Sequence, residues 1–113
     1  MDLVENVYMA TKLFPKEEIY GLTSQIRRSA ISVPSNIAEG CARNSYGEFV
    51  QFLGIATGSL AELHTQLLIA VRQKYLSKEI ATPLIKRIDE IRRMLNGLKS
   101  SVRSQPKLDV INS

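Results

Sequence analysis

Apolar residues recur every three or four positions along almost the whole chain, and this spacing restricts the folds open to it. One clear series is Leu22, Ile26, Ala30, Val33, Ile37 and Cys41. Residues at these intervals lie on one face of an α-helix. No stretch alternates apolar and polar residues for long, so the pattern of a half-buried strand is missing. The chain is therefore predicted to be all-α.

Breaks in this pattern divide the chain into four predicted helices and a tail. The helices are expected over residues 2–13, 22–42, 45–75 and 78–104, and residues 105–113 are expected to form a flexible tail. Ser45 and Glu48 form the pattern of a capping box at the start of the third helix. The fourth helix opens at Ser77 or, alternatively, at Thr82 with Pro83 as its first residue.

Pro34 lies in the middle of the second predicted helix. It cannot donate a hydrogen bond to the carbonyl of Ala30, so a kink or break is predicted over residues 32–35. Small residues surround it and favour the close approach of a neighbouring backbone: Ser29, Ala30, Ser32, Ser35, Ala38 and Gly40. Gly54 and Gly58 each cost roughly 1 kcal/mol relative to alanine in an exposed helix interior. Their presence in the third helix predicts a backbone contact there as well.

The length of the chain, 113 residues, suits one domain and is too short for two. Four helices with short connections favour an up-and-down antiparallel four-helix bundle over residues 1–104. Several apolar residues fall outside the main stripes, among them Ile31, Ile55, Leu68, Ile69 and Val71. A helix that is apolar on more than one side is buried on more than one side. The bundle is therefore expected to be one protomer of an oligomer.

Several classes of protein are disfavoured by the residues present. With one cysteine, Cys41, and one histidine, His64, no intramolecular disulfide, Cys/His metal cluster or nucleophilic catalytic set stands out. A lone thiol suits a reducing cytoplasm, and no apolar run is long enough to cross a membrane. We therefore expect a cytoplasmic protein that is not an enzyme, needs no cofactor or metal, and has no membrane partner.

The net charge of +4 is unevenly distributed. Residues 1–62 carry 5 basic and 7 acidic side chains, whereas residues 63–113 carry 10 basic and 4 acidic ones. Such asymmetry suggests a polyanionic partner. The candidate nucleic-acid-binding residues are Arg43, Lys86, Arg87, Arg92, Arg93, Lys99 and Arg103.

Four of these cations are expected to share one side of the fourth helix. On a helical wheel, the side opposite the apolar seam carries Lys86 and Arg93 and, less closely, Arg92 and Lys99. Asp89 and Glu90 interrupt the set and are spaced to pair with its members three or four residues away. An ordinary solvated face is therefore the alternative interpretation for a single copy of the chain.

A second set of polar residues is expected to fix helix packing. It comprises Arg27, Arg28, Ser35, Asn36, Glu39, Glu62 and Gln66. The two arginines are expected to pair with Glu39 and Glu62, against the third helix or a neighbouring subunit, with phosphate contacts as the alternative. The serine and the asparagine suit local backbone capping near the proline. Glu62 and Gln66, with Ser59, are expected to form a ridge that fixes the helix register.

Two segments resemble a known family. Residues 21–40, GLTSQIRRSAISVPSNIAEG, and a block from Glu48 to Leu67 are similar to the signature of the four-helix-bundle proteins of the 23S ribosomal RNA intervening-sequence family. The resemblance covers about residues 2–102 and implies a bacterial protein without assigned catalytic activity that assembles as a ring-like homopentamer. A more distant resemblance to the accessory variability protein of diversity-generating retroelements implies binding to nucleic acid and a reverse transcriptase. Family members carry further residues ahead of the stretch that begins here at Met1, so the first helix is expected to be shorter than theirs.

Two functions are consistent with these observations. The favoured one is a non-catalytic oligomeric scaffold that binds RNA or another nucleic acid through the basic face of the fourth helix. Five copies of a +4 chain carry a charge of about +20, enough to hold a phosphate backbone without reading its sequence. The alternative is a structural adaptor, an oligomer that docks a protein partner and has no role with nucleic acid.

Overall fold

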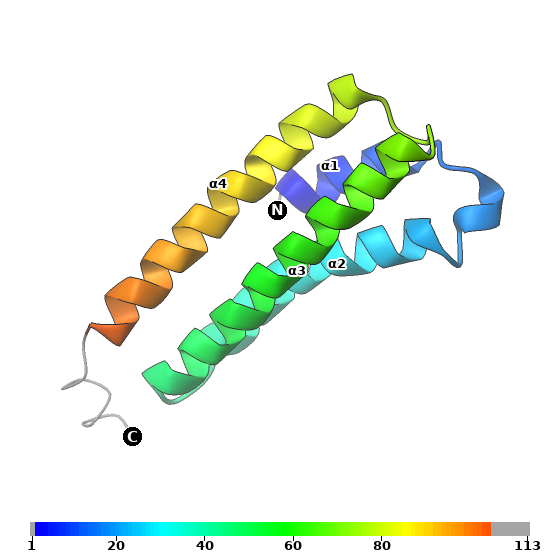
Figure 1. The fold of residues 1–113 in the computed structure, drawn as a ribbon. Coiled ribbons are helices and arrows are strands. Elements are labelled where there is room, and N and C mark those ends of the chain that lie inside the picture. The colour runs from blue at the N-terminus through cyan, green and yellow to red at the C-terminus, as the bar shows by residue number, and fades with distance from the viewer. Residues whose placement is uncertain (1, 105–113) are drawn as a thin grey trace.

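The computed structural model describes residues 2–104, and all regular structure in this range is helical. The elements are α1 (Asp2–Thr11), the 3₁₀ helix η1 (Lys16–Glu18), α2 (Leu22–Cys41), α3 (Tyr46–Arg72) and α4 (Lys78–Arg103), as Figure 1 shows. The prediction of an all-α chain with four helices is confirmed. The predicted flexible tail over residues 105–113 lies outside the described residues.

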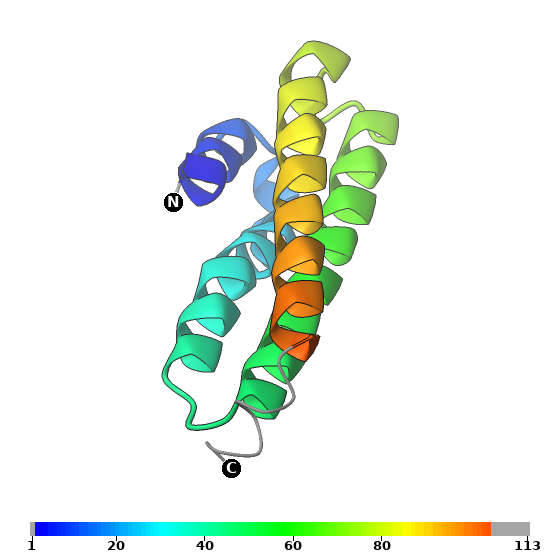
Figure 2. The same ribbon diagram turned by 90° about the vertical axis from the view of Figure 1, so that its left-hand side faces the viewer.

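The three long helices lie side by side, and α1 covers one end of them (Figures 1 and 2). Ser29 of α2 contacts Glu62 of α3, and Ser32 contacts Ser59, so the two helices run antiparallel. α1 has 10 residues and α3 has 27, which corresponds to about 15 Å and about 40 Å. α1 therefore packs on α2 and α4 at one end only, and we call this end the α1 end. The opposite end, where residues 42–45 join α2 to α3, is the turn end.

The buried stripes of the four helices meet in one core. Its buried apolar side chains are Leu3, Val7, Phe14, Ile26, Ala30, Val33, Leu53, Ala56, Leu60, Leu63, Leu67, Ala70, Leu76, Ala81, Leu84, Ile88, Ile91 and Leu95. Most of them lie on the three- and four-residue spacings of the sequence, because such residues share one helix face. The last side chain of α4 in this core is Leu95, so the final two turns of that helix contribute less to it.

Serine side chains set the start of both long C-terminal helices. Ser45 accepts a hydrogen bond from the backbone amide of Glu48 at 3.2 Å, as the capping box predicts. The Glu48 carboxylate points elsewhere, 3.9 Å from Nε of Arg43, so only half of the box forms. Ser77 accepts from the amide of Ile80 at 3.3 Å, so α4 begins at Lys78 and the alternative start at Thr82 is wrong.

Two helices end earlier than the sequence predicts. α1 stops at Thr11, two residues before the expected end, where the threonine hydroxyl donates to the carbonyl of Val7 at 2.9 Å. α3 stops at Arg72 because Lys74 adopts a left-handed conformation with φ of 65°. The amide of Tyr75 then donates to the carbonyl of Ala70 at 2.9 Å, which completes a Schellman-type end. Glycine usually marks such an end, so a lysine there gave no signal.

The α2 helix is unbroken through Pro34, so the predicted break over residues 32–35 does not occur. Asn36 supports this segment, because its Nδ2 donates to the carbonyl and to the hydroxyl of Ser32, each at 2.8 Å. This is the local backbone role expected for Asn36. Among residues 2–104, no helix combines the length and the apolar character needed to span a bilayer.

Candidate nucleic-acid interface

Most of the candidate binding residues lie on α4, which is the most strongly basic element of the chain. Its 26 residues hold seven basic and three acidic side chains. The apolar seam of α4 faces the core, which leaves these charged side chains on the exposed surface and the flanks of the helix. The electrostatic character of this side of the molecule therefore depends on which cations already have a carboxylate partner.

Asp89 neutralises part of the basic set. Its carboxylate accepts a hydrogen bond from Arg92 and lies 2.9 Å from Nη2 of Arg93. The hydrogen bond from Arg92, followed by the charge of Arg93, lowers the pKa of Asp89 below its ordinary value. Arg92 and Arg93 are thus held by an acidic residue three or four positions away, the pairing that their spacing predicts.

The ion pairs of Asp89 predict that the stability of the fold depends on pH. A lowered pKa in the folded state means that Asp89 stabilises the fold above the ordinary aspartate pKa of about 4, and that this stabilisation is lost as pH falls through the folded value. The Asp89→Asn variant should lack this component. Thermal unfolding of both proteins between neutral and acidic pH measures it. The melting temperatures should converge as pH falls, and parallel profiles would contradict the pairing.

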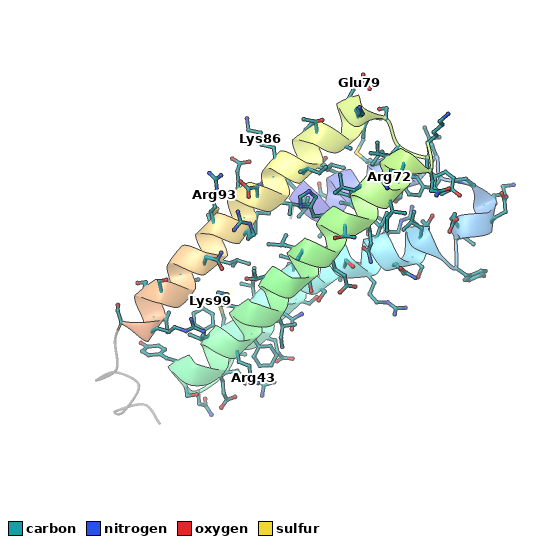
Figure 3. All side chains as sticks on the ribbon, in the orientation of Figure 1. Arg43, Arg72, Glu79, Lys86, Arg93 and Lys99 are labelled. Carbon is teal, nitrogen blue, oxygen red and sulfur yellow. The ribbon has the colours of Figure 1, made fainter. Side chains whose placement is uncertain are left out.

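The remaining α4 cations do not form one face. Five cations have no carboxylate within 4.0 Å in the described part of the chain: Lys78, Lys86, Arg87, Lys99 and Arg103. Figure 3 shows Lys86 and Arg93 on the outer side of α4, whereas Lys99 points toward α3. The expectation that Lys99 shares a side with Lys86 and Arg93 is therefore wrong. Lys99 follows Lys86 by thirteen residues, which is three full helical turns and more than half of a fourth, so the two side chains point to different sides of α4.

A second group of cations gathers at the turn end. Arg43 and Lys99 both lie there (Figure 3), and Arg103 is the last residue of α4 at the same end. The Arg43 guanidinium lies 4.7 Å from the ring centre of Phe52. It is also 3.7 Å from Glu39 and 3.9 Å from Glu48, long separations for exposed ion pairs that contribute little.

The polar residues of α2 and α3 meet in a seam between the two helices. The hydroxyls of Ser32 and Ser59 are 2.7 Å apart, and Ser29 donates to Glu62 at 3.5 Å. Gln66 is buried one turn beyond Glu62, and its Oε1 has no hydrogen-bond partner among the described residues. Of the three residues expected to form the ridge, Ser59 and Glu62 thus bond to α2, whereas no hydrogen bond joins Gln66 to it in the described chain.

Arg27 does not make the ion pair expected of it. Its Nε donates to the hydroxyl of Thr11 at 2.9 Å, and its guanidinium lies 4.7 Å from the ring centre of Tyr8. Arg27 therefore ties α1 to α2. Glu39 is twelve residues away, about 18 Å along a helix, and lies beside Arg43 instead. The role of Thr11 was missed, although its place four residues after Val7 put it on the apolar stripe.

Arg28 and Ser35 are exposed on α2, and Arg28 has no ion-pair partner within residues 2–104. Arg28 of α2 and Glu62 of α3 instead both line one pocket of about 220 Å³. The other lining residues are Gln25, Ser29, Ser32 and Ser59. We call this the seam pocket. Within the described range no three His, Cys, Asp or Glu side chains are placed to hold a metal ion.

Comparison with known proteins agrees with the sequence motifs. The family model for the 23S rRNA-intervening sequence protein matches residues 1–97. A crystal structure of a protein of unknown function from the S23 ribosomal protein family of Bacteroides thetaiotaomicron superposes with a TM-score of 0.75. The two sequences are 24% identical, and the match covers 85% of this chain and 87% of the other, so it shows a shared fold. A search of curated proteins finds no match.

Proposed function

Because the chain belongs to the 23S rRNA-intervening sequence protein family, we propose that it is a non-catalytic scaffold that binds structured RNA through cations of α4. The observation that carries this proposal is the excess of seven basic over three acidic side chains on α4. Five of those cations, Lys78 among them, have no carboxylate partner in the described chain. Cations of this kind bind a phosphate backbone without reading its sequence.

The binding surface has two parts in this proposal. Lys86 on the outer side of α4 and the turn-end group of Arg43, Lys99 and Arg103 contact phosphates at separate places. Arg92 and Arg93 contribute less because Asp89 neutralises them. The few aromatic side chains near these cations supply little base stacking, so binding depends mainly on charge.

The proposed scaffold is an up-and-down antiparallel bundle assembled as a ring-like homopentamer in the cytoplasm. Exposed apolar side chains support assembly, since Ile55 is 46% exposed, Leu68 48% and Ile69 43%. Exposed patches of this kind mark interaction surfaces. Assembly would repeat each cationic group five times, which raises the affinity of individually weak phosphate contacts.

Titration of RNA binding tests the proposal. Fluorescence anisotropy with a labelled, structured fragment of 23S rRNA should show binding at about 50 mM salt that weakens tenfold or more at about 200 mM. Changing Lys86, Arg87, Lys99 and Arg103 together to alanine should weaken low-salt binding at least tenfold. Asp89→Asn should strengthen it, because Arg92 and Arg93 are released from their carboxylate.

The matched control changes Lys12 and Lys16 to alanine, because both lysines are exposed and lie at the α1 end. This control should stay within about twofold of the unmodified protein. Three results would contradict the proposal: no binding at low salt, binding that is insensitive to salt, or an equal loss in the control. Duplex DNA of the same length measures the preference for RNA.

The second candidate function is an adaptor that docks a protein partner. The observation that favours it is a group of exposed apolar side chains around η1, in which Leu13 is 89% exposed and Tyr20 96%. If this function is correct, the fourfold alanine variant should lose no partner binding. A Leu13→Ser, Tyr20→Ser double variant should lose it.

A further inference from the structure

We infer that a pocket between α1 and α2 binds the phosphate group of a small phosphate monoester. The pocket has a volume of about 400 Å³, within the range of roughly 300–1,000 Å³ that is usual for small-ligand sites. None of its lining residues lies on α4, so the inference goes beyond the proposed binding of RNA. We call it the arginine pocket, and its lining residues are Tyr8, Ile19, Thr23, Ser24, Arg27, Arg28 and Ile31.

The charge of the arginine pocket comes from one side of α2. Thr23 and Arg27 are four residues apart, as are Ser24 and Arg28, and side chains at this spacing are neighbours on a helix surface. This side of α2 therefore presents two cations and two hydroxyls to the same pocket. No aspartate or glutamate is among the lining residues, so the pocket carries two positive charges and no negative one.

Arg27 is held in place before any ligand arrives. It is half-buried, its Nε donates to the hydroxyl of Thr11 at 2.9 Å, and its guanidinium lies 4.7 Å from the ring centre of Tyr8. These contacts use one of the five N–H groups of the guanidinium. No carboxylate lies within 4.0 Å of it in the described range. A fixed guanidinium with free N–H groups suits the oxygens of a phosphate, because little side-chain entropy is lost on binding.

Arg28 supplies the second cation from the exposed edge of the pocket. It has no carboxylate within 4.0 Å among residues 2–104, and it also lines the seam pocket beside Glu62, which is not part of the arginine pocket. The carboxylate of Glu18, at the start of α2, accepts hydrogen bonds from the amide of Leu22 at 3.0 Å and from the hydroxyl of Tyr75 at 3.1 Å. An anion between the two arginines would offset their mutual repulsion.

Thr23 gives an independent sign of a missing ligand. It is 5% exposed, and its Oγ1 has no hydrogen-bond partner within the described chain. A buried hydroxyl without a partner destabilises a fold, and most buried hydroxyls in proteins are paired. Because Thr23 lines the arginine pocket, a phosphate oxygen bound there can accept the hydrogen bond that Oγ1 does not make within the chain.

The composition of the pocket favours a phosphate monoester over other anions. Near neutral pH such an ester carries a charge of about −1.5 to −2 and has three strong acceptor oxygens. Two guanidinium groups and a buried hydroxyl match that charge and that number of acceptors, whereas a carboxylate has one charge and two oxygens. Ile19, Ile31 and the ring of Tyr8 add apolar surface for the organic part of the ester.

Calorimetric titration with adenosine monophosphate tests the inference on the full chain. We expect adenosine monophosphate to bind and adenosine, which lacks the phosphate, to bind at least tenfold more weakly. Heteronuclear NMR with the same probe should show its largest shift changes at the amides of residues 23–28. A short RNA strand with a terminal phosphate serves as a further probe. If this strand binds the pocket and adenosine monophosphate does not, the assignment to a small ester is overturned.

Two variants test the residues of the pocket. Arg28→Ala should weaken the binding of adenosine monophosphate about tenfold or more, because a charge-assisted contact is lost. The matched control is Arg87→Ala, which removes an exposed arginine without a carboxylate partner from α4 and should bind like the unmodified chain. Circular dichroism should show the same helix content in all of these proteins.

Thr23→Val separates a binding role of the hydroxyl from a structural one. The variant should melt no earlier than the unmodified chain without ligand, because the hydroxyl has no partner to lose. It should nevertheless bind adenosine monophosphate more weakly and show a smaller rise in melting temperature with the ligand. A hydroxyl that served only the fold would change the first melting temperature and leave the binding constant alone.

The inference is overturned if adenosine monophosphate binds no better than adenosine, or if Arg28→Ala and Arg87→Ala behave alike. These results are distinct from those of the RNA titration. The fourfold α4 variant should keep its affinity for adenosine monophosphate while it loses affinity for RNA. A chain that binds the nucleotide but no RNA would retain the arginine pocket and lose the scaffold function.

Discussion

Replacing Leu60 with alanine is expected to lower the free energy of unfolding by about 2–5 kcal/mol, because a fully buried leucine leaves a cavity that the core fills only partly. Leu60 is 0% exposed near the middle of α3. Urea denaturation followed by circular dichroism measures the loss. The experiment should be run at several protein concentrations, since an oligomer also gains stability from assembly.

The matched control for Leu60 lies on the same helix. Leu68 is 48% exposed, so Leu68→Ala removes a side chain that the single chain hardly buries and should cost less than about 1 kcal/mol at low protein concentration. If the two alanine variants lost equal stability there, the position of α3 in the core would be wrong. A loss for Leu68→Ala that grows with protein concentration would indicate that another copy covers this leucine.

Gly40→Leu is expected to have the other large effect, because α2 and α3 approach each other closely at this residue. A Cβ at Gly40 would lie 2.9 Å from Cβ of Phe52 and 3.0 Å from Cδ1 of Phe49. The Cβ of Phe52 cannot move unless α3 moves, so the helices must separate. Overpacking of this kind costs about 1–3 kcal/mol, and leucine adds atoms beyond the Cβ.

Chemical denaturation of Gly40→Ala, Gly40→Leu and Gly97→Ala checks the close approach. Gly40→Ala should be less stable than the unmodified chain, and Gly40→Leu should be less stable still. Gly97→Ala should lose none and gain up to about 1 kcal/mol, because its position is open and alanine favours helix. A Gly40→Ala variant as stable as the unmodified chain would show that the two helices are farther apart than the structure places them.

The helices could be predicted because apolar spacing reports directly on the buried face. Their ends were less predictable, since ends depend on single backbone conformations. Ser45 and Ser77 follow known capping preferences, whereas Lys74 occupies a left-handed position that usually signals itself through glycine. The close approach at Gly40 follows from the small residues around Pro34, but the spacing alone could not distinguish it from open positions such as Gly58.

The candidate site was predictable only in part: the sequence shows the excess of basic side chains and the pairs within one helix, but not the contacts between helices. The pairs of Asp89 with Arg92 and Arg93 follow from spacing within one helix, which the sequence displays. The bond from Arg27 to Thr11 depends on where α1 crosses α2, and no local pattern shows that crossing. Lys99 differs from Arg27, because its separation from Lys86 already places it on another side of α4, and the packing of α4 decides only that this side faces α3.

Because α1 is short, the α1 end of the bundle contains four helices in cross-section, whereas the turn end contains only the three long ones. Two contacts stabilise the α1 end: the hydrogen bond from Arg27 to Thr11, and the packing of the Phe14 and Tyr75 rings, whose centres are 5.7 Å apart. After Leu95, α4 contributes no further buried side chain to the core. The last turns of α4 can therefore open locally while the rest of the bundle stays folded. Two cations of the turn end, Lys99 and Arg103, lie on this last part of α4. In the proposed complex with RNA, these two cations can therefore follow the curvature of the phosphate backbone while the rest of the bundle keeps its shape.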